Sequence, residues 1–333
     1  MRCDFLWQAA EAKTALPILS FPAARKLGVT VNELVHSAAL QARAMEYVAH
    51  NTPTAAAVSP MELSVEAEAF GALTVFSEDE LPGIRGQLVS DLSETEALTV
   101  PTVGAGRTGV CVEAISLAKA AIPDKPVLAG LIGPFSLAGR LMDVSGILYA
   151  CFDDPEIVHT LLEKCTDFLA NYALALRAAG ADGVIMAEPL AGLIGAEMAE
   201  EFSCRYVKKI LASVQSENFP VIYHNCGSAV IPMLPELFSM GCAAYHFGDA
   251  VSMAEVLKNA PSDVLCLGNI SPVEKFASGS AASMRLAVRE LMDVCGAYPN
   301  FIPSSGCDIP IHADWENIMA FFEETEKAKK AAQ

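Results

Sequence analysis

Residues 183–224 read GVIMAEPLAGLIGAEMAEEFSCRYVKKILASVQSENFPVIYH, and this stretch contains one complete strand–helix–strand unit. The short runs GVIMA (183–187) and PVIYH (220–224) are mostly apolar and do not alternate in polarity. Such runs are typical of strands covered on both faces, as in a parallel sheet with helices outside it. The longer segment between them, 196–215, has helical spacing. The unit therefore predicts an α/β protein built around a parallel sheet.

The same alternation of short apolar runs and helical segments extends in both directions along the chain. Eight strands in alternation with helices predict a (β/α)8 TIM barrel, in which chemistry lies on the loops after the strands. An open doubly wound sheet is the alternative, but no Gly-rich phosphate loop follows any of the strands. The predicted strands are 54–58, 72–76, 126–132, 183–187, 220–224, 243–247, 264–268 and 301–305. The predicted helices are 155–179, 196–215, 229–239, 252–259, 280–295 and 314–330.

The chain has no linker or low-complexity tract, and its 333 residues are compatible with one large barrel domain. We expect residues 1–50 to form extra helices packed on the outside of the barrel. Residues 51–333 are then the (β/α)8 barrel itself, which is the predicted catalytic domain.

Composition and charge exclude several classes of protein. Charged residues make up 19% of the chain and hydrophobic residues 53%, which argues against disorder. The net charge is -18, with 22 basic and 40 acidic residues. Nucleic acid and anionic membranes are therefore poor partners, because both require a basic face. The apolar stretch 126–139 is too short to span a bilayer and contains two prolines.

The cysteines and the first residues predict a compartment. The start, MRCDFLWQAAEAK, carries an acid at Asp4 and lacks the apolar core of a secretory signal. Ten cysteines without such a signal indicate a reducing environment, in which thiols pack in the core, bind metal or react. We therefore expect a cytoplasmic protein.

Two of the loops after predicted strands contain soft metal ligands. His224 and Cys226 leave one strand, and Cys307 leaves the last strand. The carboxyl ends of barrel strands meet at one rim, so the three side chains can converge despite their separation in sequence. One His and two Cys suit Zn²⁺, and three protein ligands leave a fourth position for substrate. Gly227 and Gly306 flank the ligands and would allow unusual backbone angles or close approach of a ligand.

Other side chains on these loops are open to more than one interpretation. Glu188 ends the strand before the His-x-Cys strand and is a tentative fourth metal ligand, or else a solvated or helix-capping carboxylate. Asp249 and His246, at the end of the next strand, are equally open candidates. Asp308 follows a ligand, where it either supports the metal site or stabilises a turn. Cys226 and Cys307 can also be explained as small buried apolar groups, since free cysteines are often buried.

Several segments resemble one known family. The sequences HNCG (224–227) and SSGCDIP (304–310) resemble the two zinc-binding segments of the cobamide-dependent methyltransferases, a branch of the uroporphyrinogen decarboxylase superfamily. GPFSLAG (133–139) and GRTGVCVEAISLAK (106–119) resemble two further segments of that superfamily. The resemblance covers roughly residues 50–325, in the expected order. The His-x-Cys pair with a distant Cys is its most specific part, because true decarboxylases lack these thiolates.

The resemblance implies a reaction and its components. It implies methyl transfer between a methylated corrinoid (methylcobamide) and a zinc-activated thiol or similar acceptor, with His224, Cys226 and Cys307 as catalytic metal ligands. In the related enzymes a separate small corrinoid protein commonly carries the methyl group, and coenzyme M is the acceptor in the methanogen relatives. Arg107, in a matching segment, is expected to hold an anionic substrate group or to form a surface ion pair.

Three alternatives remain open. A uroporphyrinogen decarboxylase-type lyase needs an arginine-rich cleft, yet residues 1–50 offer only Arg2, Arg25 and Arg43, and the thiolates would have no role. Zinc–thiol methyl transfer without a corrinoid, as in cobalamin-independent methionine synthase, uses similar ligands. A non-catalytic barrel with a closed structural zinc is the third possibility.

Overall fold

The computed structural model of the chain describes residues 3–332. The strands are β1 Ala57–Val58, β2 Thr74–Val75, β3 Gly83–Ile84, β4 Val127–Ile132, β5 Gly183–Ala187, β6 Val221–Asn225, β7 Ala244–Phe247, β8 Leu265–Ile270 and β9 Phe301–Ser305. The α-helices are α1 Asp4–Ala12, α2 Pro22–Leu27, α3 Val31–Val35, α4 Ala38–Asn51, α5 Val65–Ala69, α6 Leu92–Ala97, α7 Thr108–Ala121, α8 Pro134–Met142, α9 Val144–Asp153, α10 Pro155–Ala178, α11 Ala196–Ala199, α12 Arg205–Val214, α13 Leu234–Ser239, α14 Met253–Asn259, α15 Ala281–Cys295 and α16 Trp315–Ala332.

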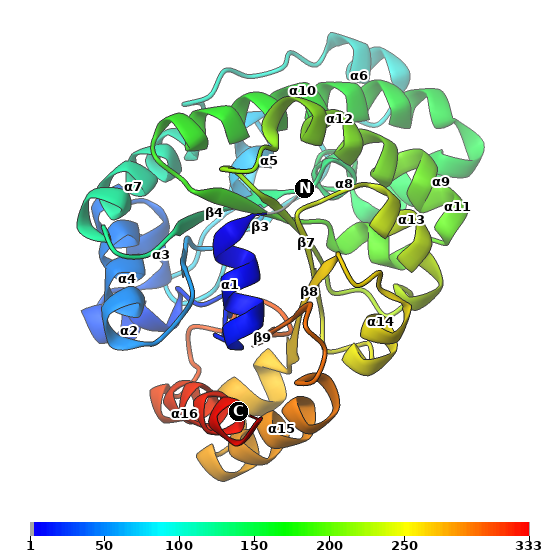
Figure 1. Cartoon of the computed structure of the whole chain (residues 1–333). Helices are drawn as coiled ribbons and strands as arrows, with labels where there is room; N and C mark the ends of the chain where they lie inside the picture. Colours follow the sequence, from blue (N-terminus) through cyan, green and yellow to red (C-terminus); the bar gives the residue numbers. More distant parts are fainter. Residues whose placement is uncertain (1–2, 333) are drawn as a thin grey trace.

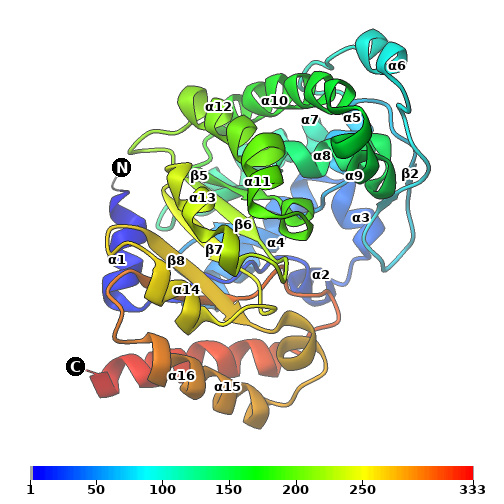
Figure 2. The same ribbon diagram turned by 90° about the vertical axis from the view of Figure 1, so that its right-hand side faces the viewer.

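Seven strands form one parallel sheet in the order β1-β4-β5-β6-β7-β8-β9. The sheet curls into a half-barrel, and the helices lie around its outer face (Figure 1, Figure 2). The predicted α/β class and parallel sheet are therefore confirmed. Seven of the eight predicted strand segments contribute strands to this sheet, and the order in the sheet follows the order along the chain.

The strand predicted at 72–76 is wrong as a barrel strand. Thr74 and Val75 pair antiparallel with Gly83 and Ile84 in a separate two-stranded sheet. Leu73 is 62% exposed and Val75 is 47% exposed, so this run is not buried on both faces. The run ALTVF has the composition of a buried strand, but it belongs to the long connection between β1 and β4.

An extended segment, residues 14–20, lies beside both edge strands of the sheet. The Leu16 amide donates a hydrogen bond to the Pro303 carbonyl of β9 at 3.0 Å. The Ala55 amide, just before β1, donates to the Ala15 carbonyl at 2.9 Å. The segment therefore links the first and last strands of the sheet through backbone hydrogen bonds.

Successive side chains along each strand face opposite sides of the sheet, which separates two apolar layers. The outer layer packs against the surrounding helices. The inner layer joins side chains from the strands to those of α1, which lies at the amino-terminal ends of the strands (Figure 1). Its strand members include Val58, Leu128, Ile185, Ile222, Ala244, Leu267 and Ile302, and its α1 members are Leu6, Ala9 and Ala10.

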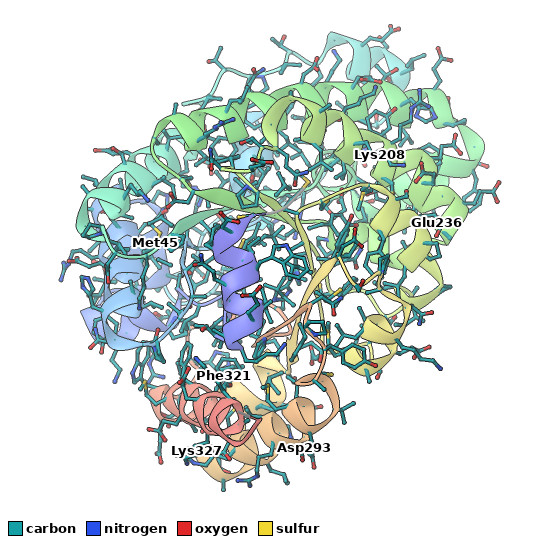
Figure 3. All side chains as sticks on the ribbon, in the orientation of Figure 1. Met45, Lys208, Glu236, Asp293, Phe321 and Lys327 are labelled. Atoms are coloured by element: carbon teal, nitrogen blue, oxygen red, sulfur yellow. The ribbon has the colours of Figure 1, made fainter. Side chains whose placement is uncertain are left out.

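The outer helices follow the predicted segments closely. Helix α10 begins with Pro155 in its first turn and ends before Gly180, which has a φ of 107°. Both features are ordinary helix boundaries. Helices were expected at the N-terminus, but α1 packs against the inner layer of the sheet and not on its outside. The division of the chain at residue 50 stays a prediction. Lys208, Glu236 and Lys327 come from helices at the periphery (Figure 3).

Within residues 3–332, no single helix is both long and apolar enough to cross a membrane. The helix pair α8 and α9 reaches the required length and composition only when counted together, and it is bent by 105°.

Candidate metal centre

His224 and Cys226 lie on the same side of the sheet because they are two residues apart. Ile222 faces the inner layer, so the period of two directs His224 inward as well. Cys226 follows immediately after β6, at the carboxyl end of the strand. His224 is only 2% exposed, whereas Cys226 is half-buried. The His-x-Cys spacing is thus a direct consequence of strand geometry.

Cys307 reaches this pair from the loop after β9. One ligand atom each from His224, Cys226 and Cys307 lies within 4.8 Å of the others. The structure therefore brings together the three side chains that the sequence singled out. Cys307 is half-buried, as Cys226 is, so two of the three groups remain partly accessible.

Glycines allow the loops to approach one another at this point. A Cβ on Gly248 would lie 2.6 Å from the Cα of Cys226, and one on Gly306 would lie 2.7 Å from the Asp249 amide nitrogen. A Cβ on Gly227 would lie 2.4 Å from the Cα of Gly192. These contacts are with backbone atoms, which cannot move aside easily. The close approach at Gly227 and Gly306 is therefore between loops of the protein, and the approach of a ligand there stays a prediction.

The three donor atoms fit a tetrahedral zinc ion. Zinc–sulfur bonds of about 2.3 Å and zinc–nitrogen bonds of about 2.0 Å at the tetrahedral angle require a nitrogen–sulfur separation of about 3.5 Å. The Nε2 atom of His224 lies 3.4 Å from the Sγ atom of Cys307. The donor set of one imidazole and two thiols is also the chemistry that Zn²⁺ favours.

The two thiols have opposite proton affinities in the metal-free protein. The Cys307 thiol donates a hydrogen bond that lowers the pKa of Cys226 to about 4, and His224 also stabilises its thiolate. The same hydrogen bond, together with burial, raises the pKa of Cys307. The pair therefore shares one proton, which a metal ion would displace, because metal ligation requires thiolates.

A second histidine holds the ring of His224. Register pairs His224 of β6 with His246 of β7, and their Nδ1 atoms lie 2.7 Å apart. His246 Nε2 lies 2.8 Å from the Ser304 hydroxyl, which donates to the Leu16 carbonyl at 2.7 Å. Burial lowers the pKa of His246 well below its ordinary value, so its ring is neutral.

His246 contacts the second ring nitrogen of His224, a role to which the sequence analysis assigned no residue. His246 was instead an open candidate for the fourth ligand. The available signal was strand parity, because His246 follows the inward-facing Ala244 by two residues. Ser304 likewise follows the inward-facing Ile302 by two residues, but nothing in the sequence singled it out.

Glu188 does not join the group. Ile185 and Ala187 face the inner layer, so the next side chain, that of Glu188, faces the outer layer. Its carboxylate accepts hydrogen bonds from the amides of Phe135 at 3.0 Å and Ser136 at 2.6 Å. Glu188 is therefore a buried carboxylate at the N-terminus of α8, which is the helix-capping role that the sequence left open. Burial raises its pKa to about 7.

Arg107 forms an ion pair, but a buried one, which corrects the expectation of a surface position. Its guanidinium contacts Glu62 and Glu68 at 2.5 Å each and donates to the Ser64 hydroxyl at 2.8 Å. Only 4% of Arg107 is exposed. Its charge is therefore already paired with two carboxylates and is not available to hold an anionic substrate.

The remaining candidates lie near the site without joining it. Asp249 is exposed and packs beside Gly306. The carboxylate oxygens of Asp308 are buried next to the backbone amides of Ile309 and Met61, and burial raises the pKa of Asp308. The other cysteines pack in the structure as expected: Cys151, Cys165, Cys204, Cys242, Cys266 and Cys295 are buried, and Cys111 is half-buried.

The fold and the site define a class: a parallel α/β protein with a His-Cys-Cys cluster at the carboxyl ends of its strands. The sequence model of the uroporphyrinogen decarboxylase (URO-D) family matches residues 15–328. The chain therefore belongs to the uroporphyrinogen decarboxylase family, and the predicted family resemblance is confirmed.

Individual relatives come from both branches of the family. The chain is 27% identical to methylcobamide:CoM methyltransferase MtbA of Methanosarcina acetivorans over 241 residues, which is 71% of this chain and 70% of that protein. It is 25% identical to uroporphyrinogen decarboxylase of Alcanivorax borkumensis over 329 residues, covering 96% and 91% of the two chains. A solved structure described as a methyltransferase from Methanosarcina mazei superposes with a TM-score of 0.86 at 21% identity, covering 96% of this chain and 97% of the other. That superposition supports the fold.

Proposed function

We propose that this protein is a zinc-dependent methyltransferase that moves a methyl group between a methylated corrinoid and a thiol or similar acceptor. The observation that carries the proposal is the gathering of His224, Cys226 and Cys307 within 4.8 Å of one another. The similarity to methylcobamide:CoM methyltransferases supports a corrinoid-dependent methyltransferase. We further propose that a separate corrinoid protein presents the methyl group.

The three clustered residues would hold the zinc ion. When bound, the zinc would accept a thiol at its remaining position and keep the sulfur deprotonated and electron-rich at neutral pH. His224 would bind through Nε2, because its Nδ1 is already hydrogen-bonded to His246. Cys226 and Cys307 supply two negative charges, which leave the bound sulfur nucleophilic. Both are half-buried, which leaves access from the rim.

The proposed reaction is a displacement at the methyl carbon. The thiol proton leaves to solvent, a carbon–sulfur bond forms, and the cobalt–carbon bond of the methylcorrinoid breaks. The bonding electron pair stays on cobalt, which passes from the +3 to the +1 state. The chain contributes position, because the glycine contacts around Cys226 and Cys307 fix the loops that carry the ligands.

Uroporphyrinogen decarboxylation is the second candidate, and the relative from Alcanivorax borkumensis favours it. Its substrate carries many carboxylates and needs free cationic groups. Arg107 cannot serve, since it is paired with Glu62 and Glu68. The thiol pair would also have no role in that reaction. These two observations favour methyl transfer.

Two features of the architecture support related proposals. We infer that residues 14–20 take the place of the eighth barrel strand, because their backbone bonds to both edges of the sheet. The barrel domain would then use a segment from the predicted helical region 1–50. We also infer a reducing compartment, because every described cysteine is free.

Anaerobic demethylation of free methylcobalamin by a thiol tests the proposed activity. We expect the zinc-loaded protein to convert methylcobalamin and 2-mercaptoethanesulfonate into cob(I)alamin and the methyl thioether. The change in cobalamin absorbance measures the rate. Cys226→Ala should abolish the conversion, whereas Cys111→Ala, a matched half-buried thiol on α7, should retain it. Equal rates for Cys226→Ala and the wild type would refute the proposal. Decarboxylation of uroporphyrinogen by both proteins would favour the second candidate.

A further inference from the structure

The ring of His224 is the end of a buried hydrogen-bonded chain that starts at the protein backbone. The chain runs from the Leu16 carbonyl to the Ser304 hydroxyl, to His246 and then to His224. Leu16, Ser304 and His246 are completely buried, and His224 is 2% exposed. Ser304, His246 and His224 come from three different strands, and Leu16 comes from the extended segment 14–20.

The Leu16 carbonyl fixes the direction of the first hydrogen bond in this series. A carbonyl oxygen can only accept, so the Ser304 hydroxyl donates its single proton to Leu16. The Ser304 oxygen can then accept from His246, whose Nε2 atom lies 2.8 Å away. With Nε2 as its donor, His246 can accept at Nδ1 from the Nδ1 atom of His224, which lies 2.7 Å away.

This order directs the Nδ1 atom of His224 to His246 and leaves its Nε2 atom as the nitrogen free to bind a metal. The same atom faces the Cys307 sulfur at 3.4 Å, in the group of potential metal ligands. A neutral histidine can bind a metal only through the nitrogen that carries no proton, and partners of the other nitrogen fix that choice. In this order, the backbone carbonyl of Leu16 determines, through two side chains, which nitrogen of His224 is available.

We propose that His246 and Ser304 are positioning residues. They fix the tautomer and orientation of His224 for metal binding, and they connect His224 to segment 14–20 through hydrogen bonds. The proposal rests on the proposed zinc site but not on methyl transfer. Neither residue binds the metal itself. The N-terminal segment acquires a role beyond packing, because its Leu16 carbonyl is the fixed acceptor at the end of the chain.

The neighbouring residue provides a matched control. Ser305 is also a completely buried serine at the end of β9, and its hydroxyl accepts from the Ile18 amide at 3.1 Å. Ser304→Ala and Ser305→Ala therefore each remove one hydroxyl that contacts segment 14–20. Of the two serine side chains, only that of Ser304 belongs to the series of hydrogen bonds that reaches His224.

Zinc affinity, measured by chelator competition on folded protein, tests the proposal. Hydrogen-bond partners of a metal ligand usually contribute about 10- to 100-fold to metal affinity. We therefore expect Ser304→Ala and His246→Phe each to weaken zinc binding by about 10-fold or more. Ser305→Ala should weaken it by less than about twofold. His246→Asn, which keeps an acceptor near the former Nδ1 position, should restore part of the affinity. The double variant Ser304→Ala/His246→Phe should bind no more weakly than His246→Phe, because Ser304 acts through His246.

Cobalt(II) substitution gives a second readout. Ser304→Ala and His246→Phe should both retain the sulfur-to-cobalt charge-transfer bands from Cys226 and Cys307. In both variants the ligand-field bands, which report the coordination of His224, should change. Equal zinc affinities for Ser304→Ala and Ser305→Ala would overturn the positioning role while leaving the zinc site intact. Wild-type protein that binds no zinc through Cys226 would overturn both this inference and the proposed function.

Discussion

In the wild type, the Glu66 carboxyl should lower the free energy of unfolding as the pH rises from acid to neutral. Glu66→Gln should remove this pH-dependent loss. Glu66 lies on α5 and is completely surrounded by protein, with 2% of its surface exposed. Its Oε1 accepts from the Ile132 amide at 3.0 Å, but its Oε2 has no partner among residues 3–332. Burial raises the pKa of Glu66 from 4.5 to about 7, and the nearby Glu62 adds to the effect.

The sign and size of the effect follow from linkage. A carboxyl whose pKa is higher in the folded state favours folding fully below its unfolded pKa, and this contribution is lost as pH rises through the folded pKa. With pKa values of 4.5 unfolded and about 7 folded, the loss between about pH 5 and pH 8 is about 2.5 kcal/mol. Glutamine does not titrate, so the variant lacks this term.

Urea unfolding of both proteins at about pH 5 and pH 8 measures the difference. We expect the free energy of unfolding of the wild type to fall between the two pH values by about 2.5 kcal/mol more than that of Glu66→Gln. Glu80→Gln, at an exposed site, should behave as the wild type does. The same pH dependence in wild type and Glu66→Gln would show that Glu66 is ionised without penalty, and would refute the reasoning.

Three further substitutions test other parts of the structure. Arg107→Ala leaves two carboxylates without their cation and should lower the free energy of unfolding by about 3–5 kcal/mol in urea titrations, whereas a loss below about 1 kcal/mol would contradict the buried ion pair. Cys307→Ser should lose most zinc affinity but keep the wild-type circular dichroism, with Cys111→Ser as the control; global unfolding would instead indicate a structural metal. Gly248→Ala places a Cβ 2.6 Å from the Cα of Cys226 and should weaken zinc binding more than Gly195→Ala, which meets nothing within 4 Å. Equal affinities for the two glycine variants would show that the loops adjust freely.

The sequence predicted the parallel sheet because most of its strands are buried on both faces and therefore lack polar residues. This rule failed at 72–76, where Leu73 and Val75 are exposed although their composition suits a buried strand. Nor could it detect residues 14–20, which bond to the sheet edges without forming a regular strand. Local composition does not report which segment lies at a sheet edge.

The metal ligands were predictable because their types and their positions after strands are both visible in sequence. The residues that support the ligands, His246 and Ser304, were less predictable, because their roles depend on the register between strands. His246 faces His224 only because β6 and β7 pair in that register. Glu188 shows the same limit: the sequence placed it after β5 but left its role open between metal ligand and helix cap, because one residue along a strand reverses the face. Its side chain caps α8.

X-ray absorption at the zinc edge of the purified protein, before and after addition of a thiol, tests the metal centre most directly. We predict two sulfur ligands and one histidine nitrogen from Cys226, Cys307 and His224, with a third sulfur once the thiol is present. Zinc without sulfur ligands, or a sulfur count that the thiol leaves unchanged, would contradict a catalytic site with an open position.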